Sequence, residues 1–273
     1  MNPPQKTSFL ELSKKSVGLR ALTTSEVHFS SEGVQALSEV EETHFWFTER
    51  RRLILKLLHH FVPAASLGID VGCGSGFNAV WLSENGLPTV GVDAHDGFRA
   101  YQSKGRGNGF IQGDIFSAEP EPEFDFLLML DVLEHIEQDR NFFAQAGKML
   151  KPGGIALVTV PAFQYLWSEV DERGGHLRRY KKSDLTAYTS LDKTRLELLY
   201  SSYFFATTLP LFFLTRKFNV KKGAQKRGDD IEKPPGPLIN TALKALLRVE
   251  GALMPYVSLP FGSSLFAIFR KSF

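Results

Sequence analysis

Acidic and imidazole side chains cluster where one long apolar run ends. Asp131, Glu134 and His135 follow the run FDFLLML (residues 124–130), and His176 lies in a polar segment further along the chain. On a helical turn, the i, i+3, i+4 spacing places the first three side chains on one face. Carboxylates and imidazoles together can bind a divalent cation, and either histidine is also a candidate general base, because imidazole titrates near neutral pH. The pattern predicts either a metal site or an acid–base site.

A second group of residues suits a nucleoside-like ligand. The stretch GIDVGCGSG (68–76) runs from apolar residues into glycines at 72, 74 and 76, which lets a ligand approach bare backbone. This spacing is shorter than the G-x-G-x-x-G of dinucleotide sites and favours a ligand without phosphates. Asp93 ends the run TVGVD, where its carboxylate can accept both hydroxyls of a ribose. Asp114 ends the next predicted strand and is placed to meet a purine amino group.

The elements that position these residues alternate between strands and helices. Strands are predicted over 66–71, 88–92, 109–113, 124–130 and 154–160, with helices at 77–85, 95–104 and 138–150. A helix over 49–61 precedes them, and a strand at 193–203, a helix at 238–254 and a strand at 263–271 follow. This alternation indicates a parallel sheet with helices on both faces, in which ligands bind beyond the carboxyl ends of the strands.

The motifs IDVGCGSG, GVD, GDI, LDVLEHI and LKPGG occur in the order and spacing of the class I S-adenosylmethionine-dependent methyltransferases. The chain resembles that family closely over 66–161 and more loosely over 40–200. The resemblance implies an α/β fold with a doubly wound, Rossmann-like sheet of seven strands, mostly parallel with the last strand antiparallel. We expect an N-terminal helical extension (1–62), a cofactor-binding catalytic core (63–202), a hydrophobic helical addition (203–262) and a last core strand (263–273).

The resemblance also implies roles for individual residues toward the cofactor, S-adenosylmethionine. The three glycines line its methionine part, Asp93 holds the ribose, and Asp114 with Ile115 holds the adenine. Asp70 orients the loop and the amino group, and the carbonyl of Leu130 lies near the sulfonium. In HFWFTERRR (44–52), Arg50 or Arg51 meets the carboxylate of the cofactor and Trp46 covers it, unless this stretch is simply an amphipathic helix start. The expected cofactor-binding set is Trp46, Arg50, Asp70, Gly72, Cys73, Gly74, Gly76, Asp93, Ala94, Asp114, Ile115, Leu130 and Asp131.

The methyl acceptor is predicted to be an oxygen. The chain has no Asn/Asp-Pro-Pro-aromatic motif for an amine, and Cys73 is misplaced for a carbon acceptor. A hydroxyl needs a base or a metal to lower its pKa. The set Asp131, Glu134, His135 and His176 resembles the Glu-x-x-Glu-His…His pattern of ubiquinone-pathway and small-RNA 2′-O-methyltransferases, with Asp in place of the first Glu. We expect His135, His176 and Asp131 to be catalytic. A Mg or Zn ion bound by all four residues is one alternative, and a histidine base without metal is the other.

Two segments are candidates for acceptor binding. The polar segment 162–185 is predicted to be a substrate lid that contributes Trp167, Arg179 and Tyr180, with a solvated surface loop as the alternative. The apolar region 203–260 favours a hydrophobic acceptor, either an aromatic or polyketide-like molecule or one linked to a carrier or lipid. The same region could instead contact a membrane surface or a second subunit.

Composition limits the remaining possibilities. The 273 residues carry a net charge of +2, so no nucleic-acid partner is expected, and the single cysteine suggests a reducing, cytoplasmic location, with or without peripheral contact with a membrane. The apolar run 203–214 is too short to span a bilayer. A non-catalytic cofactor-binding partner or sensor protein of the same fold remains the alternative function. A nicotinamide dehydrogenase is disfavoured by the glycine spacing and by LKPGG.

Overall fold

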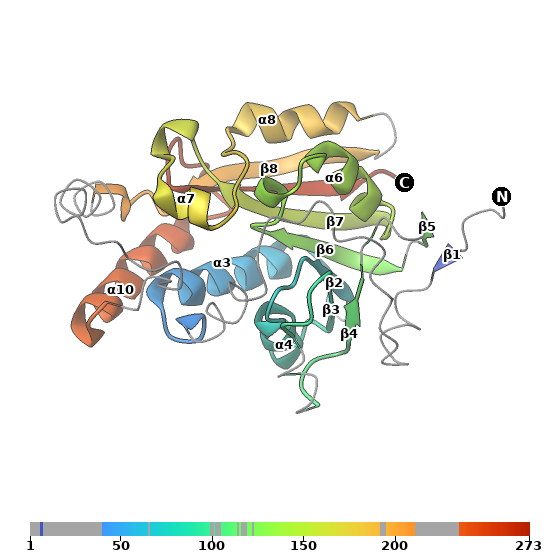
Figure 1. Cartoon of the computed structure of the whole chain (residues 1–273), viewed down its shortest axis with the longest axis horizontal. Helices are drawn as coiled ribbons and strands as arrows, with labels where there is room; N and C mark the ends of the chain where they lie inside the picture. The colour runs from blue at the N-terminus through green and yellow to red at the C-terminus, as the bar shows by residue number, and fades with distance from the viewer. Residues whose placement is uncertain are drawn as a thin grey trace.

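The structure is a computed structural model that describes residues 6–7, 40–64, 66–98, 101, 105–113, 115, 119–121, 123–191, 195–210 and 235–273. A seven-stranded sheet has the order β4-β3-β2-β6-β7-β9-β8 (Figure 1). Its strands are β2 (Gly68–Val71), β3 (Thr89–Asp93), β4 (Phe110–Gln112), β6 (Phe124–Leu130), β7 (Leu150–Pro161), β8 (Leu196–Phe204) and β9 (Ser264–Lys271). Neighbouring strands from β4 to β7 are parallel, whereas β9 is antiparallel to both β7 and β8. The predicted doubly wound sheet with an antiparallel last strand is confirmed.

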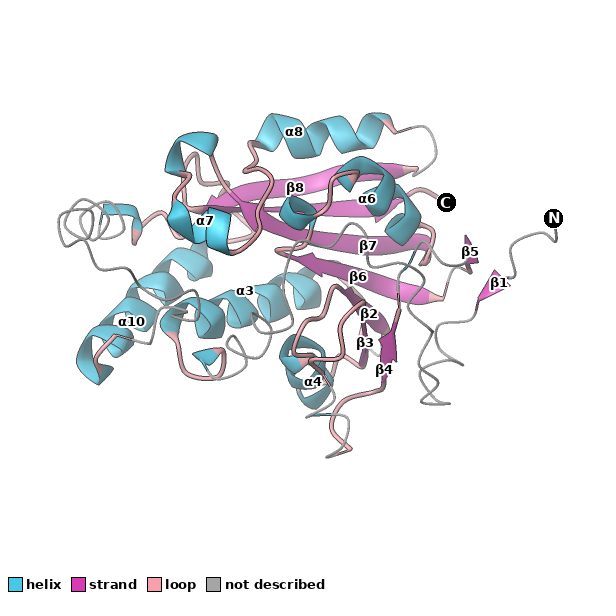
Figure 2. Cartoon of the chain, in the orientation of Figure 1, coloured by secondary structure: helices cyan, strands magenta, loops and turns pink. Residues whose placement is uncertain are grey.

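Helices cover both faces of this sheet (Figure 2). One face carries α3 (Phe45–Phe61), α4 (Phe77–Glu84) and α10 (Pro237–Leu253), and the other carries α6 (Asp139–Gly147) and α8 (Lys182–Thr186). The short α7 (Glu169–Arg173) and the single turns η2 (Leu133–His135), η3 (Gln164–Leu166) and η4 (Ala187–Ser190) follow strand ends or helices. Two short strands, β1 (Lys6–Thr7) and β5 (Glu119–Pro120), pair with each other apart from the main sheet.

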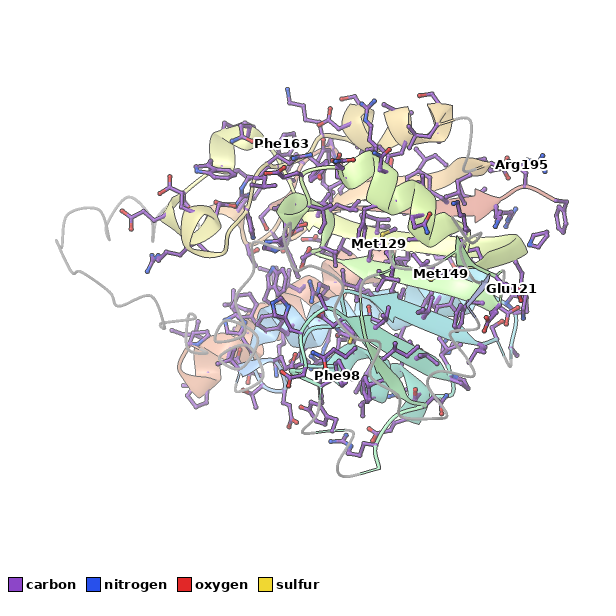
Figure 3. The ribbon with its side chains drawn as sticks, turned by 45° about the vertical axis from the view of Figure 1, so that its right-hand side comes forward. Phe98, Glu121, Met129, Met149, Phe163 and Arg195 are labelled. Carbon is purple, nitrogen blue, oxygen red and sulfur yellow. The ribbon has the colours of Figure 1, made fainter. Side chains whose placement is uncertain are left out.

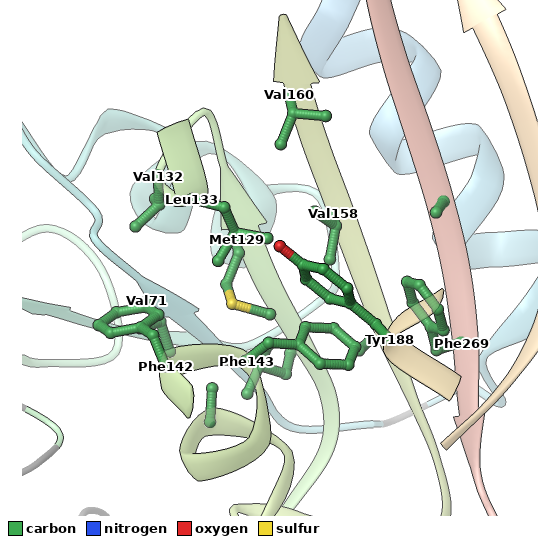
Figure 4. Packing of buried hydrophobic residues seen from close by; sticks show 14 of the residues in the cluster. Val71, Met129, Val132, Leu133, Phe142, Phe143, Val158, Val160, Tyr188 and Phe269 are labelled. Carbon is green, nitrogen blue, oxygen red and sulfur yellow. The ribbon is translucent and has the colours of Figure 1, made fainter. Parts of the chain in front are cut away.

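The core divides into two hydrophobic clusters, one on each face of the sheet. Along β6, Leu127 and Met129 belong to the cluster beneath α6, whereas Phe126 and Leu128 belong to the cluster beneath α3. Figure 4 shows the first cluster, with Met129 packed among rings of Phe142, Phe143 and Tyr188 from the covering elements. Burial on both faces explains why β6 is apolar at nearly every position instead of at every second one.

Three predicted elements differ from the structure in type or by four residues at one end, and the others agree to within three residues. The predicted helix 95–104 is wrong over 95–98, which form bends and a turn, and most of its remainder lies outside the described residues. The strand β7 begins at Leu150, four residues earlier than predicted. Residues 151–154 form an irregularity within it, because the pairing shifts from Phe124–Leu150 to Phe126–Ile155 and Gly153 has a left-handed backbone (φ +78°). The helix α3 begins at Phe45, four residues earlier than predicted, because His44 accepts a hydrogen bond from the backbone N–H of Trp46.

The helical addition is described only in part. The chain after β8 buries Phe205 and Leu209, residues 211–234 lie outside the described residues, and α10 then packs along α3. The side chain of Asn240 accepts from the backbone N–H of Phe45, and Lys56 donates to the carbonyls of Gly251 and Ala252. No helix within the described ranges is long and apolar enough to cross a membrane.

Candidate active site at the carboxyl ends of the strands

The glycine loop connects β2 to α4 at the carboxyl edge of the sheet. This is the edge at which Phe163 follows β7, whereas Met149 precedes β7 at the opposite edge (Figure 3). Gly72, Gly74 and Gly76 all have left-handed backbones, with φ of +75°, +55° and +80°. A Cβ atom would lie 2.6 Å from Val132 at Gly72 and 2.5 Å from Phe110 at Gly76, but would meet nothing within 4 Å at Gly74.

These environments give the glycines different roles. Close packing requires glycine at positions 72 and 76, since any side chain there would overlap a neighbour. At Gly74 the space beside the backbone is open, so a ligand can approach the loop there. The backbone N–H of Gly74 donates to Asp93 Oδ2 over 2.7 Å, which joins the loop to the end of β3.

Other residues predicted to bind the cofactor lie around this loop. Asp93 also accepts from the backbone N–H of His95, so its carboxylate stays fixed at the strand end, with Ala94 following it. Ile115 is buried in the cluster beneath α6, and Asp114 lies outside the described residues. Cys73 is buried, and burial raises the pKa of its thiol well above the usual range, which suits the absence of a chemical role.

Asp70 is the most unusual side chain of the site. It is buried at the end of β2, and neither of its carboxylate oxygens has a hydrogen-bond partner within the described part of the chain. Burial raises its pKa to about 7, Arg50 opposes this rise, and the negative charges of Asp93 and Glu41 add to it. A buried carboxylate without a partner is costly, so this position suits a ligand that brings a positive charge.

The N-terminal part of α3 covers the glycine loop. The guanidinium group of Arg50 lies 4.3 Å from the ring centroid of Trp46 and pairs with Asp131, which also accepts a hydrogen bond from Thr159. Burial lowers the pKa of Arg50 to about 10, and the guanidinium stays charged at neutral pH. Arg51 instead packs over the ring of Phe77 at the start of α4.

This pairing corrects the predicted four-residue metal set. The chain after β6 does not enter an α-helix at Asp131, whose backbone is left-handed (φ +57°), and the turn η2 begins only at Leu133. The i, i+3, i+4 spacing therefore does not bring Asp131 onto the face of Glu134 and His135. Asp131 instead points to Arg50, next to the end of β6 where Leu130 ends the strand.

The structure does bring Glu134, His135 and His176 together. One ligand atom from each residue lies within 4.8 Å of the others, and the two imidazole centroids are 4.9 Å apart. Both oxygens of the buried Glu134 lack a hydrogen-bond partner among the described residues, and burial raises the pKa of this carboxyl to about 8. The predicted convergence of the two histidines from different loops is present in the fold.

Each imidazole is held by an acceptor at its Nδ1 atom. His135 Nδ1 lies 3.3 Å from the carbonyl oxygen of Gly175, and His176 Nδ1 lies 2.9 Å from Asp171 Oδ1. A hydrogen on Nδ1 in both rings leaves the lone pair on Nε2, which is the arrangement that orients histidine ligands in metal sites.

Sequence reasoning did not assign a site role to Asp171, which anchors this loop. Its fully buried carboxylate accepts from His176, from Arg179 and from the backbone N–H of Ser168. Burial pushes the pKa of Asp171 upward, but the hydrogen bonds from His176 and Arg179 outweigh that effect and lower it, so the group is ionised. The one sequence signal was the position of Asp171 five residues before His176, within reach across the Gly174–Gly175 turn.

Sequence reasoning also missed Glu41. This residue precedes α3, is buried, and accepts a 2.6 Å hydrogen bond from the Ser75 hydroxyl of the glycine loop. Burial raises its pKa to about 7. No pattern near position 41 indicates this contact, which joins residues 34 positions apart.

Two of the three predicted substrate contacts, Arg179 and Tyr180, are engaged by partners within the protein. Tyr180 is buried in the cluster beneath α6 and donates its hydroxyl to Asp139, and Arg179 is committed to Asp171 and to the carbonyl of Ala162. Both side chains stabilise the segment 162–185 through these hydrogen bonds. Trp167 is partly exposed and donates its indole N–H to Glu172.

Comparison with known proteins agrees with this geometry. Residues 69–158 match a family model described as a methyltransferase domain. The ubiquinone biosynthesis O-methyltransferase of Rickettsia bellii is 30% identical over 113 residues, which cover 39% of this chain and 47% of that protein. The matched segment thus spans about half the length of such relatives.

Solved structures share the fold. An S-adenosylmethionine-dependent methyltransferase from Thermotoga maritima superposes with a TM-score of 0.52 at 16% identity, covering 89% of this chain and 100% of that one. Phosphoethanolamine N-methyltransferase 2 of Haemonchus contortus, solved with S-adenosyl-L-methionine, superposes with a TM-score of 0.54 at 16% identity. The superposition covers 98% of this chain and 60% of that one. The domain match, the strand order and the glycine loop together identify residues 69–158 as a methyltransferase domain with the class I S-adenosylmethionine-dependent methyltransferase fold.

Proposed function

We propose that this protein transfers the methyl group of S-adenosylmethionine to a hydroxyl oxygen of a hydrophobic acceptor, with a divalent cation bound by Glu134, His135 and His176. The observation that carries the proposal is the meeting of these three side chains at the same sheet edge as the glycine loop. The acceptor is an aromatic, polyketide-like or carrier- or lipid-linked hydroxyl. Support for the hydroxyl comes from the relatives named for O-methylation in ubiquinone biosynthesis.

The residues present fit S-adenosylmethionine. The unpartnered carboxylate of Asp70 suits the ammonium group of its methionine part, the open side of Gly74 admits it to the backbone, and Asp93 is fixed at the end of β3 for the ribose. When bound, S-adenosylmethionine supplies a methyl group on a sulfonium, which a nucleophile can displace in line. Arg50, stacked on the ring of Trp46, is the candidate partner for the carboxylate of the methionine part.

The donor set also fits a divalent cation. Glu134 offers a buried carboxylate without a hydrogen-bond partner in the described ranges, and both histidines have their Nδ1 atoms fixed by a carbonyl or a carboxylate. Two imidazoles and one carboxylate suit Zn²⁺ or a similar transition metal better than Mg²⁺, which prefers oxygen ligands. A cation held there would lower the pKa of a nearby hydroxyl, while Asp171 and Arg179 keep His176 in place.

The test combines metal binding with methyl transfer. The purified protein is dialysed against chelator, titrated with Zn²⁺ or Mg²⁺ in a calorimeter, and assayed with labelled S-adenosylmethionine on alkyl-substituted catechols. Glu134→Gln and His176→Ala are expected to lose metal binding and at least about 100-fold in turnover, yet keep S-adenosylhomocysteine binding. His59→Ala, an exposed histidine on α3, is the matched control.

Two outcomes contradict the proposal in separable ways. Turnover that is insensitive to chelator, with unchanged metal content in Glu134→Gln, removes the cation and leaves a histidine as general base. Tight S-adenosylhomocysteine binding without transfer to any hydroxyl of the panel points instead to a non-catalytic cofactor-binding protein.

A further inference from the structure

The guanidinium group of Arg50 lies among several carboxylates. Its positive charge attracts Asp70, Glu134 and Glu41, most strongly Asp70, and its Nη1 atom donates to Asp131. The side chain of Asp131 is 24% exposed, whereas Asp70 and Glu134 are 1% and 0% exposed. Neither of the two buried acids has a hydrogen-bond partner among the described residues. Arg50 therefore binds the acid that needs a partner least.

This choice of partner runs against the cost of burial. A buried carboxylate without a partner costs free energy, and attraction between buried charges is screened much less than attraction at a surface. A bond from Arg50 to Asp70 would relieve that cost, while water can solvate the exposed part of Asp131. The observed pairing therefore needs a local cause.

The local cause is the fixed position of Asp131. Its backbone is left-handed (φ +57°), and its N–H donates to the carbonyl of Thr159 over 2.9 Å. Its Oδ1 atom accepts from the Thr159 hydroxyl over 3.0 Å, so the residue is tied to the neighbouring strand β7 while Oδ2 meets Arg50. A left-handed backbone is uncommon for aspartate, and such positions cluster at functional sites.

We propose that Asp131 is a positioning residue that keeps Arg50 away from Asp70, so that the buried carboxylate of Asp70 stays available for the ammonium group of the cofactor. The inference rests on the role that the proposed function gives to Asp70. It adds the reason why this buried acid does not pair with Arg50. It also gives Asp131 a role that needs neither a metal ion nor a reacting atom.

Neutralising Asp131 should release Arg50. In Asp131→Asn the amide oxygen can still accept from the Thr159 hydroxyl, and asparagine tolerates a left-handed backbone, so the turn after β6 is retained. A neutral amide holds a guanidinium group less strongly than a carboxylate does. Arg50 is then expected to pair with Asp70, where it competes with the ammonium group of a ligand.

The experiment compares two adenosine ligands that differ by one ammonium group. 5′-Deoxy-5′-(3-aminopropylthio)adenosine carries the ammonium group but lacks the carboxylate of the methionine part, and 5′-methylthioadenosine carries neither group. Calorimetry at pH 8 gives both affinities, and their ratio reports whether Asp70 is free to receive the ammonium group. The wild type is expected to prefer the aminopropyl ligand by at least about tenfold.

The variants separate the roles of the three side chains. Asp131→Asn should lower the preference to below about threefold, as should Asp70→Asn, which removes the receiving carboxylate. Adding Arg50→Gln to Asp131→Asn removes the competing cation and should restore a preference of at least about tenfold. The matched control is Asp125→Asn, which neutralises a partly exposed aspartate at the other end of β6, paired with Lys151, and should keep the preference.

Affinity for 5′-methylthioadenosine shows that the adenosine pocket of each variant is folded. If Asp131→Asn loses this affinity too, Thr159→Val decides in its place, because it removes only the hydroxyl that holds Asp131 and should lower the preference in the same direction. Restoration by Arg50→Gln is a result that a merely structural role of Asp131 would not produce.

The inference is overturned if a folded Asp131→Asn variant keeps the full preference, or if Arg50→Gln does not restore it. A wild type without any preference removes the role of Asp70 itself, and the inference with it. None of these measurements depends on methyl transfer or on a metal ion. A failure of the proposed O-methylation would therefore be seen separately, in the turnover assay.

Discussion

Asp70→Asn is expected to make the protein without cofactor more stable at alkaline pH. The carboxylate of Asp70 is buried without a hydrogen-bond partner among the described residues, and burial raises its pKa from 3.8 to about 7. A carboxyl whose pKa is higher in the folded than in the unfolded state binds its proton more tightly when folded. Its contribution to stability is therefore fully present below pH 4 and is lost as the pH rises through about 7.

The size of the effect follows from this shift. A rise of about 3 pH units, at about 1.4 kcal/mol each, means that ionising Asp70 opposes folding by up to about 4 kcal/mol at pH 8. Asparagine has nearly the same shape and cannot ionise. The difference in unfolding free energy between variant and wild type should then be near zero at pH 4 and approach this limit at pH 8. Glu134 titrates in both proteins, so its effect cancels in the comparison, whereas the repulsion between Glu41 and Asp70 is part of the difference that is measured.

Urea denaturation of both proteins from pH 4 to pH 8.5 gives the difference directly. Glu197→Gln, which removes an exposed carboxylate on β8, serves as control and should show no such trend. A second measurement checks the functional side of the argument. If Asp70 receives the ammonium group of the cofactor, the stabilised variant must bind S-adenosylhomocysteine more weakly at pH 8. A stability difference that does not change with pH would refute the reasoning from burial.

Three further predictions concern the site and its support. Asp93→Ala should weaken S-adenosylhomocysteine binding by about 1.5–3 kcal/mol in calorimetry, and an unchanged affinity would remove Asp93 from the ribose role. Tyr180→Phe should lower the unfolding free energy by about 1 kcal/mol through its lost bond to Asp139, with an unchanged KM for the acceptor; a raised KM at unchanged stability would restore the substrate role. Gly76→Ala should lower the melting temperature more than Gly74→Ala, since only the former overlaps a ring, whereas Gly74→Ala should impair cofactor binding more; the reverse order would contradict the assigned roles.

Local sequence patterns were sufficient to predict the strands of the sheet. Nearly continuous apolar runs such as FDFLLML specify strands buried on both faces. The glycines at 72, 74 and 76 specify a loop with left-handed backbone conformations, which residues with side chains rarely adopt. The seven-stranded, mostly parallel sheet with an antiparallel last strand followed from the resemblance of the motifs to methyltransferases, and the order of neighbouring strands came from the structure. The convergence of His135 and His176 could also be anticipated, since both follow strands whose carboxyl ends meet at one edge.

The contacts that complete the site could not be anticipated. Asp131 pairs with Arg50, Asp171 fixes His176, and Glu41 accepts a hydrogen bond from Ser75. These partners are distant in the sequence, and they meet only because the loops and α3 pack against the sheet in one particular arrangement. The backbone at Asp131 turns left-handed, which no residue pattern announces and which separates it from Glu134.

The sequence by itself determined the alternation of strands and helices and the glycine loop, because these depend on periodicity and on residues with special backbones. Its motifs carried the resemblance to methyltransferases. Only the tertiary structure decided which carboxylates are buried without partners among the described residues, which histidines share a site, and which side chains of α10 are exposed. Charge, burial and pairing are properties of the space around a side chain. That space is created by segments distant in the sequence, so local sequence cannot specify it.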